Sequence, residues 1–152
     1  MTLAVLIGPD RVLVGVRAAD KPRLLAELAR RAAGALGLAA ADIATALAAR
    51  EALGSTGVGA GIAVPHAQVA TLGGTAAFLA RLDRPIDYGA VDGRPVDLVF
   101  LLLGPPAARA EHLAALAAAT RRLRDPATAD ALRGAATAEA MRLRFVADPP
   151  NT

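Results

Sequence analysis

The sequence contains no cysteine and no tryptophan, and aromatic residues make up only 3% of its 152 positions. Disulfide bonds are therefore excluded, and the absence of cysteine gives no information on the redox compartment. A nucleic-acid interface combines basic clusters with stacking aromatic side chains, so the low aromatic content argues against a nucleic acid partner. No apolar run approaches the ~18 residues that span a bilayer, and a basic leader segment is missing. These absences predict a cytoplasmic protein without membrane insertion.

Charge is almost balanced, with 17 basic and 14 acidic residues and a net charge of +3. Nearly all the basic residues are arginine, and Lys21 is the only lysine. Together with the high alanine content, this preference for arginine indicates a general bias in amino-acid composition rather than a polyanion-binding surface. The cluster of Arg121, Arg122 and Arg124 is predicted to be the solvated end of a helix, where cations suit the helix dipole.

Strand and helix patterns alternate along the chain, which indicates the α/β class. The predicted strands span residues 11–17, 62–64, 76–82 and 96–103, the last being apolar enough for burial on both faces. The predicted helices span residues 20 to 34 or 37, 42–53, 111–124, 129–132 and 137–145. The tight turns between residues 76 and 103, including one at Arg84-Pro85, suggest antiparallel pairing and hence a mixed β-sheet.

Side chains at the helix ends and along their apolar faces give more detailed expectations. Asp20, with Pro22 after it, is predicted to cap the first long helix, and Asp42 to cap the second. The second helix is predicted to turn Ile43, Leu47 and Leu53 inward. The apolar stripe of the helix that follows residue 111 is predicted to comprise Leu113, Leu116, Ala117, Thr120 and Leu123.

The stretch 50–66 combines residue types suited to holding an anion. Its four glycines allow positive φ and bring backbone N–H groups close to a bound anion. Ser55 and Thr56 add hydroxyl donors, and Arg50 offers a planar fork that suits phosphoryl oxygens. Neither of the common glycine patterns for nucleotides can be spelled from these residues. The stretch therefore predicts a phosphate site that is not built for a nucleotide.

His66 ends this stretch and supplies a nucleophile. Pro65 favours an extended Val64, so residues 62–64 are predicted to form a buried strand that brings His66 to its end. Imidazole is largely neutral at pH 7 and can attack phosphorus directly. Beside a phosphate cradle, this histidine predicts a phosphohistidine.

The run from Arg50 to His66, REALGSTGVGAGIAVPH, resembles the active-site segment of the enzyme IIA proteins of the bacterial phosphoenolpyruvate phosphotransferase system. The likeness is to the fructose/mannitol class and, within it, to the stand-alone nitrogen-regulatory branch. Residues 20–21, 85–88, 92–93 and 111–113 also fall in the family's order and spacing, so the resemblance covers about residues 13–143. It implies a three-layer α/β/α sandwich with a mixed sheet. It implies one IIA type-2 domain over residues 1–147, and residues 148–152 are expected to be a disordered tail.

The resemblance also implies roles for single residues. His66 accepts a phosphoryl group, through Nε2, from a histidine phosphocarrier protein, and His112 faces it across the site. Arg50 helps to hold the phosphoryl group, and no metal or organic cofactor is needed. The phosphate-cradling loop comprises Ser55, Thr56, Gly57, Val58 and Gly59. Ala60 stands where many relatives carry Asn or His, which leaves partner choice open.

Simpler interpretations exist for the same residues. His66 or His112 alone could be structural, and Ser55 and Thr56 could serve only to shape the turn. Glu51 is predicted to be a structural partner rather than a site residue. A zinc site is disfavoured because neither histidine has another ligand type at a metal-binding spacing, and a serine hydrolase is excluded because no nucleophile elbow surrounds Ser55.

Three functions remain open at this level. The first is a regulatory phosphotransferase component whose phosphorylation state controls target proteins. The second is a fructose- or mannitol-specific IIA protein that passes the phosphoryl group to a separate IIB/IIC permease. The third, suggested by Ala60, is a binding module that has lost phosphorylation.

Overall fold

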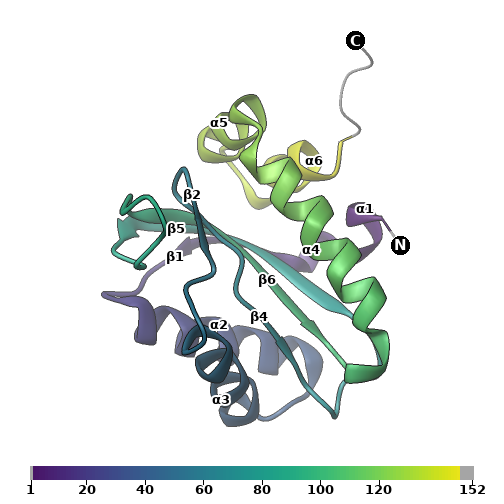
Figure 1. Ribbon diagram of the computed structural model, residues 1–152. Helices are drawn as coiled ribbons and strands as arrows, with labels where there is room; N and C mark the ends of the chain where they lie inside the picture. Colours follow the sequence, from purple (N-terminus) through teal and green to yellow (C-terminus); the bar gives the residue numbers. More distant parts are fainter. Residues whose placement is uncertain (1, 148–152) are drawn as a thin grey trace.

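The computed structural model describes residues 2–147, and the predicted tail at residues 148–152 lies outside them. A mixed six-stranded sheet forms the middle layer, with helices on both faces (Figure 1). The strands are β1 (Val12–Val16), β2 (Gly57–Gly59), β3 (Ile62–Ala63), β4 (His66–Gln68), β5 (Ala76–Ile86) and β6 (Val96–Gly104). Their order is β1-β5-β6-β3-β2, and β4 also pairs with β6. The predicted three-layer α/β/α architecture is confirmed.

Two groups of helices cover the two faces of the sheet (Figure 1). One face is covered by α2 (Lys21–Leu36) and α3 (Ala40–Glu51). The other is covered by α1 (Leu3–Leu6), α4 (Arg109–Arg124), α5 (Pro126–Gly134) and α6 (Ala138–Val146). Two short 3-10 turns, η1 (Pro9–Arg11) and η2 (Pro106–Ala108), join these elements. Among the described residues, no helix is long and apolar enough to cross a membrane.

Strand β6 holds the two layers together, as its continuous apolar run predicts. It pairs antiparallel with β5 on one side and parallel with β3 and β4 on the other. Successive side chains of a strand point to opposite faces. Accordingly Val99 and Leu101 pack with α2 and α3, whereas Leu98 and Phe100 pack with α4, α5 and α6. The result is one hydrophobic cluster on each face of the sheet.

The ends of the first long helix follow the sequence signals, but the second helix starts earlier than predicted. The Asp20 carboxylate accepts a hydrogen bond from the Arg23 N–H, and α2 ends at Gly37, whose φ is 69°. Helix α3 begins at Ala40, so the prediction that Asp42 caps it was wrong. Alanine is the best helix former, which lets the helix extend back through residues 40 and 41. Asp42 lies instead in the first turn, where a carboxylate suits the dipole.

Other local predictions were also wrong. Arg84-Pro85 is no turn, because β5 continues to Ile86 with an irregularity in its pairing after Arg81. Proline is tolerated at such a break in the hydrogen-bond ladder. The buried stripe of α4 consists of His112, Ala115, Ala119 and Leu123. Leu113 is 52% exposed, and Leu53, which lies beyond the end of α3, is 84% exposed. The arginine cluster is not wholly solvated either, because Arg122 donates to the backbone oxygens of residues 144 and 145.

Candidate active site

Two short strands, β3 and β4, position His66 along β6. Both pair in parallel with that strand, Ile62 opposite Leu98 and His66 opposite Leu102. The predicted strand at residues 62–64 is therefore broken at Val64 and Pro65, and His66 opens the next strand rather than ending the first. Proline has no N–H to give to a ladder, but its carbonyl oxygen accepts a hydrogen bond from Leu102.

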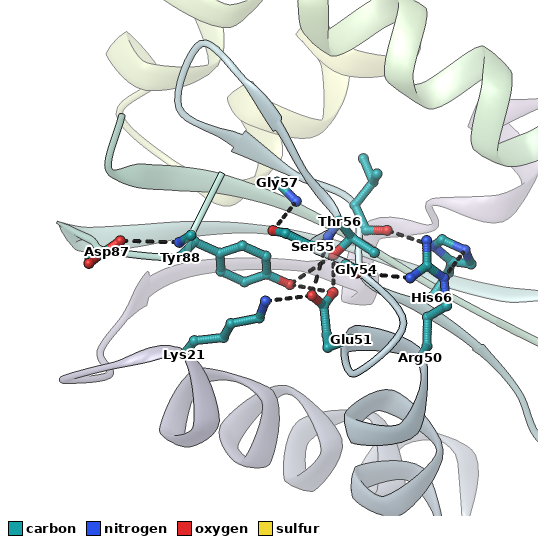
Figure 2. A network of polar contacts seen from close by, with 12 residues as sticks. Lys21, Arg50, Glu51, Gly54, Ser55, Thr56, Gly57, His66, Asp87 and Tyr88 are labelled. Carbon is teal, nitrogen blue, oxygen red and sulfur yellow. Dashed lines mark hydrogen bonds and ion pairs between the residues drawn. The ribbon is translucent and has the colours of Figure 1, made fainter. Parts of the chain in front are cut away.

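The His66 ring is held in one tautomer. Its Nδ1 lies 2.8 Å from the carbonyl oxygen of Val64. A carbonyl oxygen can only accept, so Nδ1 carries the ring proton and Nε2 presents its lone pair. The Nε of Arg50 donates to that lone pair at 3.3 Å (Figure 2). The nucleophilic nitrogen and a fixed positive charge are therefore in direct contact.

Arg50 lies in the last turn of α3 and closes the loop that follows the helix. Its Nη1 donates to the carbonyl oxygen of Gly54 at 2.9 Å. The bonds to Gly54 and His66 use two of the five N–H donors of a guanidinium. Donors remain for an oxyanion bound next to the His66 ring.

His112 faces His66 from the first turn of α4. The two ring centroids are 5.6 Å apart and the ring planes are inclined by 58°. His112 is only 6% exposed. Burial, together with the neighbouring His66, lowers the pKa of His112 below its ordinary value. The lowered pKa favours the neutral ring at pH 7, and burial is the main cause.

Glu51 follows Arg50 in the chain but points into a separate polar network (Figure 2). Its carboxylate accepts from Lys21 Nζ at 2.6 Å, from the Tyr88 hydroxyl at 3.0 Å, and from both the N–H and the hydroxyl of Thr56. Burial alone would raise the pKa of Glu51, but the bonds from Lys21 and Thr56 outweigh it, so the pKa is lowered.

Tyr88 and Lys21, the other partners of Glu51 in this network, also contact each other. Burial, followed by the nearby Glu51 carboxylate, raises the pKa of Tyr88, which therefore stays a phenol. The Lys21 ammonium lies 4.4 Å from the centroid of the Tyr88 ring. Lys21 and Tyr88 lie in two of the stretches that carry the family resemblance, but no role was predicted for them, because no local pattern links the start of one helix, the end of another and a turn. A further signal is that each is the only residue of its type in the chain.

The two hydroxyls expected in the phosphate loop have partners inside the chain. Thr56 is only 3% exposed, and its hydroxyl binds Glu51 and Tyr88. The Ser55 hydroxyl accepts from the Gly57 N–H at 3.0 Å, a contact that shapes the turn. In this structure both hydroxyls form hydrogen bonds within the chain that stabilise the loop.

The second half of the predicted loop is a strand that leads away from His66. Residues 57–59 form β2, which pairs antiparallel with β3, Gly59 lying opposite Ile62. Because Ile62 and His66 pair with positions of β6 four residues apart, roughly 13 Å of strand separates them. The structure thus brings His66, His112 and Arg50 together, but it does not bring Val58 and Gly59 to them.

The tip of this β2–β3 hairpin is the turn at Ala60 and Gly61. Both have positive φ, 57° and 79°, as a type I′ turn requires. The Ala60 N–H donates to Asp92, and the Ala60 carbonyl oxygen accepts from Arg133.

Within residues 2–147, no group of three or more His, Cys, Asp or Glu side chains is placed to hold a metal ion.

Comparison with known proteins gives consistent results. Residues 6–145 match the family model described as phosphoenolpyruvate-dependent sugar phosphotransferase system, EIIA 2. The chain is 43% identical over 152 residues to a nitrogen regulatory protein of Bradyrhizobium diazoefficiens, covering 100% of this chain and 99% of the relative. It is 42% identical over 147 residues to a nitrogen regulatory protein of Pseudomonas aeruginosa, covering 96% and 95% of the two chains. The crystal structure of the nitrogen regulatory protein IIA-Ntr from Neisseria meningitidis matches with a TM-score of 0.88 at 30% identity, over 93% of this chain and 97% of that one.

Proposed function

The chain belongs to the EIIA 2 family of the phosphoenolpyruvate-dependent sugar phosphotransferase system, and on this premise we propose that it is a phosphorelay protein. His66 accepts a phosphoryl group from the phosphohistidine of a histidine phosphocarrier protein. The observation that carries the proposal is the His66 ring, with Nδ1–H bound to Val64 and the Nε2 lone pair facing Arg50. A nucleophile with its lone pair already directed at a cation is prepared for an anionic electrophile.

The transfer is an in-line exchange of one N–P bond for another. The lone pair of His66 Nε2 attacks phosphorus while the carrier's N–P bond breaks, and the carrier's imidazole leaves with the electron pair. Nε2 carries no proton, so none has to be removed before attack. The positive charge that develops on the attacking ring is stabilised by the Nδ1–H bond to the Val64 oxygen. The transition state is loose, so positioning and electrostatics dominate the catalysis.

Arg50 and His112 form the cradle for the phosphoryl oxygens. Attack needs the single lone pair of Nε2, so the hydrogen bond from Arg50 opens as phosphorus approaches, and the Nε–H of Arg50 turns to an equatorial oxygen. Neutral His112 donates one N–H from the other side. Ser55 and Thr56 act indirectly in this proposal, because their hydroxyls already hold the loop that carries Arg50's partner Gly54.

The proposed biological role is regulatory, as in the relatives named nitrogen regulatory protein. Phosphorylation adds close to two negative charges beside Arg50 and so changes any surface that docks there. Leu53 follows Arg50 by three positions and Leu113 adjoins His112, and both leucines are exposed. In this proposal, these two exposed side chains contribute apolar area to the surface on which the phosphocarrier and a regulated target protein dock in turn.

The test is the intact mass of the protein after incubation with phosphoenolpyruvate, enzyme I and a histidine phosphocarrier. We expect one added, acid-labile phosphoryl group, which is absent in His66→Ala and forms more slowly in His112→Ala. No added mass with several carriers would contradict the relay and leave a binding module. Efficient passage of the group to fructose or mannitol through a permease would instead indicate a transport component with a IIB partner.

A further inference from the structure

Two buried polar atoms near the site have no hydrogen-bond partner among the described residues, and they border the same small space. They are Nδ1 of His112 and the hydroxyl oxygen of Thr75. A Cβ atom placed on Gly104 would lie 3.2 Å from the His112 nitrogen and 3.6 Å from the Thr75 oxygen. Buried polar atoms are nearly always paired, so two that meet at one point call for a common explanation.

Three elements converge on this space. Gly104 is the last residue of β6, Thr75 immediately precedes β5, and His112 lies in the first turn of α4. The φ of Gly104 is not positive, so its backbone conformation is open to any residue. What glycine contributes here is room beside the imidazole, which a side chain would reduce.

The two nitrogens of His112 are in different surroundings. Nδ1 is sealed against Thr75 and Gly104, whereas Nε2 is not among the buried atoms that lack a partner. A neutral imidazole has one donor and one acceptor nitrogen. For His112 to donate to a phosphoryl oxygen through Nε2, Nδ1 must be the acceptor. Nδ1 then needs a donor, and the unpartnered Thr75 hydroxyl beside Gly104 can supply one.

We propose that Thr75 is a positioning residue for His112. Its hydroxyl donates to Nδ1, after rotation about the Thr75 Cα–Cβ bond or through one water molecule beside Gly104. This bond holds the ring in the tautomer that carries its proton on Nε2. The consequence for phosphoryl transfer rests on the proposed function, but the tautomer is a property of the unphosphorylated protein and can be measured without any transfer.

The first test is imidazole ¹⁵N NMR of the unphosphorylated protein at pH 7.5, with His112 assigned by comparison with His112→Gln. We expect the wild type to show an unprotonated Nδ1 and a protonated Nε2. Thr75→Val, which has the same shape, should shift His112 towards a mixture of tautomers, and Thr75→Ser should restore the wild-type pattern. Thr120→Val is the matched control. Thr120 lies on α4, the helix that carries His112, and its hydroxyl donates to the carbonyl oxygen of Leu116 within that helix.

A protonated Nδ1 in the wild type would overturn the proposal, and so would identical His112 signals in wild type and Thr75→Val. The second test is the rate of His66 phosphorylation. Thr75→Val should slow it about fivefold to tenfold, the worth of one buried hydrogen bond, and should cause no further loss in a His112→Ala background. If the wild type accepts no phosphoryl group, the proposed function fails, while the NMR result still decides the role of Thr75.

Discussion

Arg50 and Glu51 are neighbours in the chain, yet they enter two polar clusters with opposite properties. The Glu51 cluster, formed with Lys21, Thr56 and Tyr88, is buried, balanced in charge and fully hydrogen-bonded. The histidine cluster, formed by Arg50, His66 and His112, is incompletely bonded. Arg50, which donates to His66 Nε2 and to the Gly54 carbonyl oxygen, keeps N–H donors that no described residue uses.

Under the proposed function, the difference separates a cluster that stabilises the fold from one that binds a ligand. Saturated buried networks stabilise a single arrangement, and removing one member leaves the others unpaired. Groups that keep unused donors or lone pairs are destabilising in isolation and gain their partners only when a substrate binds. The bonding state of each cluster therefore predicts which measurement a substitution will affect.

Arg50→Ala should give the largest effect, and it should be on activity alone. We expect the rate of His66 phosphorylation to fall about 100-fold, because a preorganised donor to the transferring group is lost. The free energy of unfolding should change by less than about 1 kcal/mol, as for other substitutions outside the core. Arg50→Lys is the control that keeps the charge without the planar fork, and a rate close to wild type for it would contradict a role for the fork.

Glu51→Gln should do the reverse. It leaves the Lys21 ammonium without its counter-ion in a largely buried position, so the protein should lose about 2 kcal/mol of unfolding free energy in urea titrations. The double variant Lys21→Met/Glu51→Gln should lose less than the sum of the single variants. Full stability with a lost phosphorylation rate would place Glu51 in the site rather than in the scaffold.

Acid should weaken the two clusters in different pH ranges. The pKa of His112 is lowered in the folded protein, so the unfolded chain takes up a proton first, and stability is lost as pH falls below about 6.5. The lowered pKa of Glu51 gives stability that is present above about 4.5 and is lost only at lower pH. Unfolding free energies measured from pH 8 to pH 3 should show both steps. His112→Gln should remove the upper step and Glu51→Gln the lower.

Ala60→Asn should give the smallest effect and serves as a reference outside both clusters. Alanine at positive φ is strained, and Asn-Gly is the preferred pair for a type I′ turn. We expect the unfolding free energy to rise by about 0.5–1 kcal/mol, with no change in the phosphorylation rate of His66. A changed rate would show that the hairpin tip influences the site.

Much of the fold could be predicted because its signals are local. The Asp20 cap, the Gly37 helix end and the apolar run of β6 each depend on neighbouring residues. The buried face of α4 could not, because an alanine-rich helix offers little contrast between its faces, and Ala115 and Ala119 are no more apolar than their neighbours. The predicted start of α3 was wrong for a similar reason, because the alanines at residues 40 and 41 extend the helix back beyond the expected cap.

The candidate site shows the same division. His66 and Arg50 lie in one continuous pattern, and His112 entered through the family resemblance. The contacts around these residues form only when the chain folds. Tyr88 donates to Glu51, which lies 37 positions away, and Thr75 and His112 both lie beside Gly104. The hydroxyls in the glycine-rich loop were predicted to donate to phosphate, but the Thr56 hydroxyl donates to the Glu51 carboxylate instead.

The single lysine of the chain has a practical consequence for chemical labelling. Its amine is paired with Glu51 and lies over the Tyr88 ring, and its side chain is only 24% exposed, so we expect an acylating reagent to react with it faster when the start of α2 and the end of α3 separate. With one side-chain amine per molecule, modification at Lys21 appears as a single peptide mass. A change in its rate reports a change in how well this part of the scaffold is closed, and comparing phosphorylated with unphosphorylated protein shows whether charge placed on His66 affects it.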